Sequence, residues 1–304
     1  MLGIATVPQD ILAFLADDPG AEAGSVLVTL TGIEGSTSRA LGAQLAVRAD
    51  GSYLGSFSGG CIEAAVVAEA LAVLAEGRGR TVRYGVGSPF IDIRLPCGGG
   101  IDLLFTPRPD LAALRRVLES LEARQPAALD VAADGIAPGA TDGFVCRYLP
   151  PLRVLALGQG EDLAAFARLA QRYGLKVECH VPDESMAGED CAVHRLQQRS
   201  AVPELSSDPW TAIVFLFHDH DWEEALLPAA LAVPALFIGA VGSPRTQAAR
   251  SQMLRVKGVS ETVIQRLRGP IGLIPATRDP GTLALSILAE LVAVYQAACR
   301  SVRG

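Results

Sequence analysis

The stretch that decides the fold reads RVLALGQGEDLAAFARLAQRYGLKVECHV and occupies residues 153–181. After its first residue comes an apolar run, VLAL, with the length of a buried strand. A turn containing Gly158 and Gly160 follows, and residues 162–173 then repeat apolar side chains at helical spacing. A second run, mostly apolar, closes the stretch at residues 176–181. Strand, helix and strand in this order form a β-α-β unit with parallel strands. We therefore predict a Rossmann-like, doubly wound parallel sheet.

The alternation of strands and helices continues from this unit towards the end of the chain. We expect further strands at residues 211–217 and 235–238, and helices at residues 222–231, 245–256, 261–267 and 283–297. The segment 225–244 carries no charge and is long enough to raise the question of a membrane span. Because Pro228 and Pro234 interrupt it, we expect a short helix, a turn and a buried strand, with no membrane association.

The first half of the chain has a different pattern, in which short strands predominate. We expect strands at residues 26–30, 45–47, 53–54, 81–84 and 101–105, and helices at residues 9–16, 62–76 and 110–123. Residues 133–143 are small and turn-rich, and Pro150 and Pro151 cannot continue regular structure. We place the domain boundary there. The prediction is an α/β chain with an N-terminal α+β domain, residues 1–150, and a C-terminal Rossmann-like domain, residues 151–304.

Composition and charge narrow the class of protein. Of the 304 residues, 50% are hydrophobic and 19% are charged, which suits two buried cores. The formal net charge is −7 and no dense basic run occurs, so we expect no nucleic-acid partner. The start of the chain lacks a positive leader before an apolar run, and we expect a cytoplasmic protein. The six cysteines include no C-x-x-C pair, so we expect no zinc cluster and reduced, small side chains.

Three glycine-rich segments of the first domain are suited to an anionic ligand. Residues 34–39 offer N–H and O–H donors and one positive charge. Residues 58–63 form a glycine turn running into a helix, and we expect Cys61 in the first helical turn, where the helix dipole favours the thiolate. Residues 95–100 place Cys97 beside three glycines. The alternative, a buried filler, is disfavoured at Cys61 and stays open at Cys97. The candidate cofactor-binding residues here are Gly35, Ser36, Thr37, Arg39, Gly59, Gly60, Cys61, Glu63, Cys97, Gly98 and Gly99, with Cys61 also the candidate catalytic residue.

The second domain has three candidate sites where strands end, the edge at which open α/β sheets bind ligands. The turn at residues 158–160 lies between a strand and a helix, where a dinucleotide-binding fingerprint would lie. However, Glu161 places a carboxylate beside the phosphate position, and Val181 occupies the position where an acidic residue would bind the ribose. We therefore do not expect NAD(P). The turn at residues 239–245 suits either an anion or ordinary helix capping. Two of the four histidines lie at residues 218–220. The candidate cofactor-binding residues here are His218, Asp219, His220, Gly239, Gly242, Ser243 and Arg245.

Taken together, these motifs resemble those of the XdhC/CoxI family of xanthine dehydrogenase accessory proteins. The similar segments are, in chain order, residues 35–39, 59–63, 97–99, 218–220, 239–245 and 268–273. The resemblance implies an N-terminal cofactor-handling domain and a C-terminal Rossmann domain, usually in a homodimer. It also implies that the protein binds a molybdopterin-type molybdenum cofactor, protects it during sulfuration with a cysteine desulfurase, and delivers it to a xanthine-dehydrogenase-type molybdenum hydroxylase.

We therefore expect a maturation factor and chaperone rather than a turnover enzyme. Ser36, Thr37 and Arg39, with glycine N–H groups, would hold the pterin phosphate. Cys61 would contact the molybdenum or its incoming sulfur, and we expect no other metal. Two alternatives stay open. One is an NAD(P)-dependent oxidoreductase that uses His218 or His220 as its acid or base, and the other is a scaffold that binds only proteins.

Overall fold

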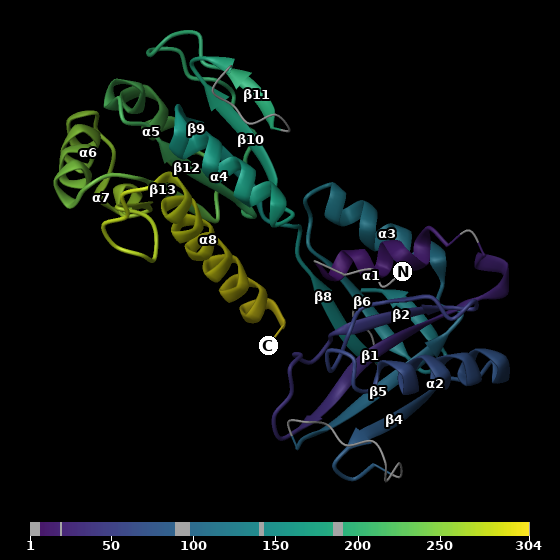
Figure 1. The fold of residues 1–304 in the computed structure, drawn as a ribbon. Helices are drawn as coiled ribbons and strands as arrows, with labels where there is room; N and C mark the ends of the chain where they lie inside the picture. Colours follow the sequence, from purple (N-terminus) through teal and green to yellow (C-terminus); the bar gives the residue numbers. More distant parts are fainter. Residues whose placement is uncertain (1–6, 19, 89–97, 140–142, 185–190, 304) are drawn as a thin grey trace. The chain divides into compact units, whose positions relative to one another are not determined.

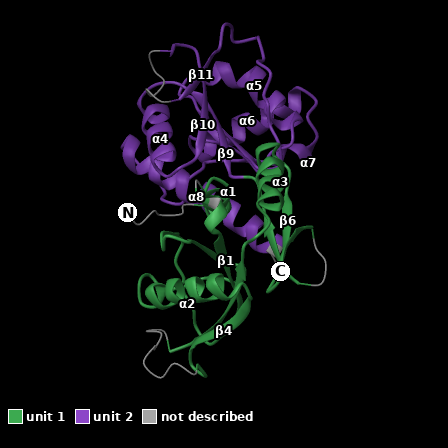
Figure 2. Cartoon of the chain, turned by 90° about the vertical axis from the view of Figure 1, so that its right-hand side faces the viewer, with its two compact units in different colours: residues 1–150, 303 green, residues 151–302, 304 purple. Residues whose placement is uncertain are grey.

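The computed structural model describes residues 7–18, 20–88, 98–139, 143–184 and 191–303. The chain divides into two compact units, residues 1–150 and residues 151–302. Figures 1 and 2 show that each unit is built from its own strands and helices. The sheets and the hydrophobic cores of one unit are separate from those of the other. The mixed α/β fold class predicted from the sequence is confirmed.

An antiparallel five-stranded sheet with the order β3-β2-β1-β5-β4 forms the centre of the first unit. Its strands are β1 (Ser25–Glu34), β2 (Gln44–Arg48), β3 (Tyr53–Leu54), β4 (Arg80–Gly85) and β5 (Gly100–Pro107). Successive side chains of a strand point to opposite faces. Val26 and Val28 accordingly share a core with α2 (Glu63–Glu76), whereas Leu27 shares a second core with α1 (Pro8–Ala16) and α3 (Leu111–Glu122). A short 3-10 turn, η1 (Ala21–Ala23), precedes β1.

A second, three-stranded sheet in this unit was missed by the sequence analysis. It consists of β6 (Ala127–Ala132), β7 (Gly135–Pro138) and β8 (Phe144–Tyr148), in the order β7-β6-β8. Leu129 and Val131 of β6 are buried in the same core as α1 and α3. The small residues that indicated only turns therefore contribute the edge strand β7 and its connections, and β8 returns to the other side of β6.

The second unit is a parallel six-stranded sheet with the order β11-β10-β9-β12-β13-β14. The strands are β9 (Arg153–Gly158), β10 (Lys176–Val181), β11 (Ala192–Arg195), β12 (Thr211–Leu216), β13 (Phe237–Ala240) and β14 (Leu267–Arg268). The helices are α4 (Glu161–Arg172), η3 (His220–Trp222), α5 (Glu223–Ala232), α6 (Pro244–Val256), α7 (Glu261–Ile264) and α8 (Pro280–Arg303). The strand order reverses between β9 and β12, which is the doubly wound Rossmann topology predicted from the sequence.

Two cores cover the two faces of this sheet. Val154 and Ala156 of β9 belong to the core that includes residues of α4 and α8. Leu155 and Leu157, on the alternate positions, belong to the core that includes residues of α5, α6 and α7. Because β9 is buried on both faces, its sequence is an unbroken apolar run rather than an alternating one.

Two apolar segments of the second unit raise the question of a membrane span. The uncharged stretch 225–244 folds into most of α5, a turn and β13, as predicted. Helix α8 is long and apolar enough to cross a membrane by length and composition alone. Its residues Ile287 and Leu291 are fully or almost fully buried in the core of the sheet, whereas only a third of its apolar window as a whole is buried.

The cysteines depart in part from the expectation of six reduced side chains. Cys179 of β10 and Cys191, just before β11, form a disulfide, with their Cα atoms 6.2 Å apart. The spacing of twelve residues gave no sign of this pair, because only the pairing of β10 with β11 brings the two positions together. Among the described residues, Cys146 and Cys299 are buried cysteines outside any disulfide, and Cys61 is an exposed one.

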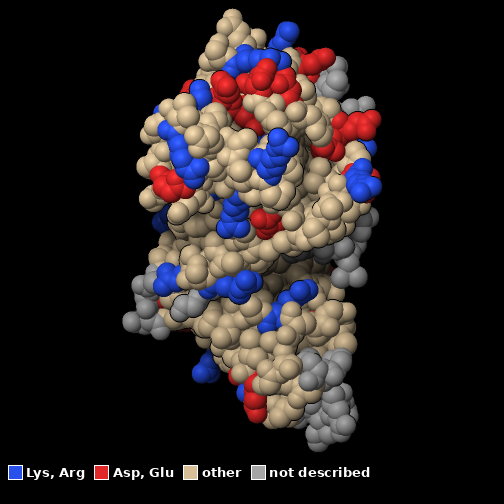
Figure 3. Space-filling model, turned by 90° about the vertical axis from the view of Figure 1, so that its left-hand side faces the viewer, with Lys and Arg blue, Asp and Glu red and all other residues tan. Residues whose placement is uncertain are grey.

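Charged side chains of both signs occur on the face drawn in Figure 3, most of which is uncharged. Several arginines are engaged within the protein. Arg80 pairs with Glu69 and Glu76, and Arg199 pairs with two aspartates. A positive charge neutralised in this way contributes little to binding a polyanion.

Candidate functional site

Three loops of the first unit lie at one end of its five-stranded sheet. Glu34 at the end of β1 is the register partner of Gly100 at the start of β5, and β4 ends beside Gly100 at Gly85. Strand β3 runs antiparallel to β2, so the chain leaves β3 at the same end. The segments after β1, after β3 and before β5 are therefore neighbours. These segments carry the three motifs that the sequence analysis selected.

Direct contacts join the first loop to the second. The Ser38 hydroxyl donates to the carbonyl oxygen of Phe57 over 2.7 Å, and the Arg39 Nε–H donates to the carbonyl oxygen of Ser56 over 2.9 Å. The first loop is also stiffened internally, because the Arg39 backbone N–H donates to the Thr37 hydroxyl oxygen over 3.3 Å. Residues 35–39 and 56–63 therefore form one continuous surface.

The third segment packs against the first so closely that it requires glycine. A Cβ atom added to Gly99 would lie 2.4 Å from the carbonyl oxygen of Ser36 and 2.7 Å from that of Glu34. Gly98 has a φ of 69° and open space beside it. The structure thus brings Gly98 and Gly99 beside the hydroxyl-rich loop, while Cys97 lies outside the described residues.

The carboxylate of Glu63 organises the second loop. Oε1 accepts hydrogen bonds from the Ser56 hydroxyl and from the backbone N–H groups of residues 57 and 58, over 2.8–2.9 Å. Oε2 accepts from the Ser58 hydroxyl (2.8 Å), the Gly60 N–H (2.8 Å) and the Ile62 N–H (3.2 Å). Glu63 is only 2% exposed. Its carboxylate is therefore committed to the loop and serves to position it.

The pKa of Glu63 reflects this environment. Burial by itself would raise the pKa of the carboxyl group. The hydrogen bonds from Ser58 and Ser56 outweigh the burial and lower the pKa to about 2. The charged form is therefore the one that fits the loop, and it is fully populated at neutral pH.

Cys61 lies at the exposed tip of this loop. Helix α2 begins at Glu63, with Ile62 as its N-cap. Cys61 therefore precedes the helix, and the prediction that it lies in the first helical turn is wrong. Gly59 and Gly60 have φ values of 77° and 119°, and no atom of the described residues lies within 4 Å of the Cβ position of either. The loop therefore presents a thiol beside open space.

Some donors expected to face a ligand are used inside the protein. The Gly59 N–H donates to the Ser56 hydroxyl oxygen over 2.9 Å, and the Gly60 N–H donates to Glu63. Ser36, Cys61 and Arg39 remain exposed, and the one side-chain hydrogen bond of Arg39 among the described residues is made by its Nε–H. These groups have the chemistry to bind an anion and a soft metal or sulfur atom.

The sequence analysis missed the residues that support this surface. Ser56 and Ser58 hold the carboxylate of Glu63; a Ser-x-Ser-Gly-Gly segment just before a helix that begins with glutamate is the signal that could have identified them. Arg83 of β4 forms ion pairs with Glu34 and with Asp102, the latter over 3.1 Å, and so connects the ends of three strands.

The second unit places its candidate residues at the carboxyl edge of the parallel sheet. His218, after β12, contacts Asp162 in the first turn of α4, with 3.0 Å between Nε2 and Oδ2. Glu161 is the first residue of the same helix. Two carboxylates therefore stand at the helix end where a dinucleotide phosphate would bind.

His220 and Asp219 also have partners within this unit. His220 Nδ1 lies 3.2 Å from Oε2 of Glu223, and Glu223 forms a buried, bidentate pair with Arg250, in which both N–O distances are 2.7 Å. Asp219 forms an ion pair with Arg199 and caps η3 by accepting from the Asp221 N–H. These contacts give His220 and Asp219 structural roles within the unit.

The turn after β13 has the helix cap that the sequence predicted. The Ser243 hydroxyl accepts from the Thr246 N–H over 3.1 Å, and Pro244 is the first residue of α6. Gly239 lies inside β13, where a Cβ atom would be 2.5 Å from both Ile271 and Phe237. Gly242 has a φ of 140°, and Arg245 is exposed. Gly239 is thus a packing residue, whereas Ser243 and Arg245 lie at an open helix terminus.

Comparisons with known proteins match both halves of the chain. The profile of the XdhC and CoxI family matches residues 21–85, which include the first two loops, and the profile of the XdhC Rossmann domain matches residues 154–291. The chain is 38% identical over 296 residues to the molybdenum cofactor insertion chaperone PaoD of Escherichia coli (strain K12), covering 94% of this chain and 88% of that protein.

Two further similarities are weaker. The chain is 28% identical over 257 residues to the uncharacterized protein YqeB of Escherichia coli (strain K12), covering 83% of this chain but 40% of that protein. The crystal structure of a xanthine dehydrogenase from Bacillus halodurans has a TM-score of 0.75 and 21% sequence identity, with 96% of each chain covered. At that identity the similarity shows the fold alone.

Proposed function

This chain belongs to the XdhC and CoxI family, and from that premise we propose that it is an insertion chaperone for a molybdenum cofactor. A role in cofactor maturation agrees with the relative that matches over nearly the whole chain, which is a molybdenum cofactor insertion chaperone. The cofactor is then the cargo of this protein, which it binds and passes on.

The observation that carries the proposal is the loop surface of the first unit. An exposed thiol, Cys61, stands on a loop fixed by a buried carboxylate, beside the exposed hydroxyl of Ser36 and the guanidinium of Arg39. A molybdopterin-type cofactor has a metal with soft ligands at one end and a phosphate at the other. The thiol suits the metal end, and the guanidinium and hydroxyl groups suit the phosphate.

The finer features of the proposal extend the family resemblance. We propose that the bound cofactor is protected while a cysteine desulfurase supplies its terminal sulfur, and that a xanthine-dehydrogenase-type hydroxylase receives it. We also propose that the protein acts in the cytoplasm as a homodimer. Cys61 is the residue that would contact the molybdenum or the incoming sulfur, with Cys97 as the second candidate.

The test is the metal and pterin content of the protein purified from cells that make the cofactor. We expect Cys61→Ser to lose most of the co-purified molybdenum and pterin while unfolding at the same temperature as the wild type. Cys299→Ser is the control, because it removes a cysteine that is outside any disulfide and lies in the other unit. Wild-type molybdenum content in Cys61→Ser would refute the role of this cysteine.

A further inference from the structure

Two histidines and a glutamate lie together on neighbouring strands of the second unit. Glu178 and His180 are two residues apart on β10 and so lie on the same face of the sheet. His194 of β11 is the register partner of His180. One ligand atom from each of the three side chains lies within 4.8 Å of the other two. This cluster belongs to neither the loop surface of the first unit nor the carboxyl edge of the sheet.

His180 is buried with one ring nitrogen unpartnered among the described residues. It is 3% exposed, and its Nδ1 atom has no hydrogen-bond partner among the described residues. A buried polar atom without a partner is costly.

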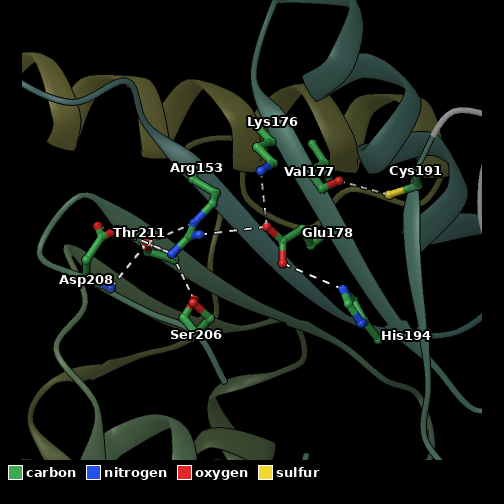
Figure 4. Close-up of polar contacts among 9 residues, drawn as sticks. All are labelled: Arg153, Lys176, Val177, Glu178, Cys191, His194, Ser206, Asp208 and Thr211. Carbon is green, nitrogen blue, oxygen red and sulfur yellow. Dashed lines mark hydrogen bonds and ion pairs between the residues drawn. The ribbon is translucent and has the colours of Figure 1, made fainter. Parts of the chain in front are cut away.

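Glu178 has one oxygen directed at the histidines. Its Oε2 atom lies 3.7 Å from Nε2 of His194, as Figure 4 shows. The other oxygen, Oε1, lies 3.8 Å from Arg153 and 3.9 Å from Lys176, beyond hydrogen-bond distance in both cases. A carboxylate with one oxygen on this side can bind a cation there while the other oxygen keeps its contacts with the basic groups.

Arg153 does not depend on Glu178 for its position. It donates to the carbonyl oxygen of Ser206 over 2.8 Å and forms an ion pair with Asp208 at 3.3 Å (Figure 4). Asp208 therefore compensates part of the positive charge of Arg153, which lowers the repulsion that a metal ion bound to Glu178 would meet.

We propose that Glu178, His180 and His194 bind a divalent transition metal of the zinc class at the edge of the sheet between β10 and β11. Two imidazoles and one carboxylate form a ligand set that zinc uses, with a fourth position left for water or another ligand. Zinc bonds of about 2.0–2.2 Å place tetrahedral ligand atoms about 3.5 Å apart, so the cluster must contract by about an ångström.

The exposed member of the cluster can make this adjustment. The rings of His180 and His194 are stacked, with centroids 4.7 Å apart and planes inclined by 19°. One ring must therefore turn for both nitrogens to point at one metal. The side chain of His194 is 51% exposed, so it can rotate without disturbing the core, whereas His180 is fixed by its burial.

Metal binding would hold an otherwise weak edge of the sheet. Strand β11 has four residues, all of them exposed, and a short exposed edge strand opens readily. The metal would connect β11 to β10, as the disulfide between Cys179 and Cys191 does. A ligand that binds only the folded state raises its stability, so we expect zinc to raise the melting temperature of this unit.

The experiment is a calorimetric titration of the full chain with Zn²⁺ after treatment with a chelator. We expect one equivalent to bind, and His194→Ala to weaken binding at least tenfold. His218→Ala is the matched control, since it removes another exposed histidine from the same unit; it should bind zinc as the wild type does. Cys61→Ser, titrated in parallel, identifies zinc bound by the exposed thiol.

A second measurement covers the case in which a variant folds poorly. Co²⁺ bound to the wild type should give ligand-field bands without a thiolate charge-transfer band, and the bands should be lost in His180→Asn and in His194→Ala. Zinc affinity unchanged in His194→Ala, or a thiolate band lost in Cys61→Ser, would overturn the proposal. Molybdenum content does not enter either measurement, so the proposed chaperone function is tested separately.

Discussion

Replacing Glu63 by glutamine tests whether one buried charge holds the loop that carries Cys61. The amide oxygen of Glu63→Gln can replace one carboxylate oxygen, but its NH₂ group cannot accept. If the amide oxygen takes the position of Oε1, the Gly60 N–H loses its acceptor and the Ile62 N–H loses one of its two. If the amide is turned round, the N–H groups of residues 57 and 58 lose theirs. Two backbone donors are affected in either orientation.

Two estimates of the cost agree. A buried donor left without an acceptor costs about 1–3 kcal/mol. Independently, lowering the pKa of Glu63 from 4.5 to about 2 corresponds to about 3 kcal/mol in favour of the ionised form, at 1.36 kcal/mol for each tenfold change. We therefore expect Glu63→Gln to reduce the free energy of unfolding of this unit by about 2–4 kcal/mol.

The same contact gives stability a specific pH dependence. Because the pKa of Glu63 is lower in the folded than in the unfolded protein, its contribution is complete above pH 4.5 and is lost as the pH falls from 4.5 to about 2. Urea unfolding of the wild type at a series of pH values should show this loss in the free energy of unfolding. In Glu63→Gln, the free energy of unfolding should depend less on pH over the same range.

The control and the readouts separate a positioning role from general destabilisation. The control is Glu76→Gln, which removes an exposed glutamate from helix α2. The ion pair between Glu76 and Arg80 contributes no more than about 1 kcal/mol to stability. Hydrogen exchange should accelerate at the Phe57, Ser58 and Gly60 amides in Glu63→Gln alone, and molybdenum content should fall with it. A loss below about 1 kcal/mol in Glu63→Gln, with an unchanged acid slope, would refute this account of the loop.

Two further predictions concern the other close contacts. Gly99→Ala should lower the free energy of unfolding by about 1–3 kcal/mol and reduce the molybdenum content, because the new Cβ would lie 2.4 Å from the Ser36 carbonyl oxygen. The control is Gly135→Ala, because no described residue lies within 4 Å of the Cβ position there. Equal melting temperatures of the two variants would contradict the prediction. NAD and NADP should show no micromolar binding by calorimetry. The reason is that Glu161 and Asp162 occupy the first turn of α4 and repel a phosphate by about 1 kcal/mol or more. A micromolar dissociation constant would disprove this prediction.

The elements with a strong period could be predicted from the sequence. The run of residues 154–157 and the helix after Gly160 were identifiable because a strand buried on both faces is wholly apolar and a helix repeats every three to four residues. The cap at Ser243 could be predicted for the same reason, since it depends only on neighbours in the chain. Strands β6 to β8 could not, because the burial of Leu129, Val131 and Tyr148 depends in part on α1, which is distant in sequence.

The candidate site could be predicted only as a set of segments. Glycine and hydroxyl residues marked the loops at residues 35–39 and 59–63, but the sequence did not show that Ser38 and Arg39 bond to the second loop. Nor could it distinguish a carboxylate that faces a ligand from one that, like Glu63, is enclosed by its own loop. His194 gave no signal at all, because β11 was not predicted and its importance arises from register with His180.

The two units differ in how their polar groups are used, and this difference bears on where a ligand binds. In the second unit, His218 pairs with Asp162 and His220 with Glu223, so a ligand that uses these histidines after β12 must first break contacts that the fold already makes. In the first unit, the contacts of Glu63 lie beneath the loop and leave Cys61 and Ser36 exposed. A site preorganised from below keeps its geometry when a ligand arrives and loses no internal bond. We therefore expect the cofactor to bind first at the loop surface of the first unit.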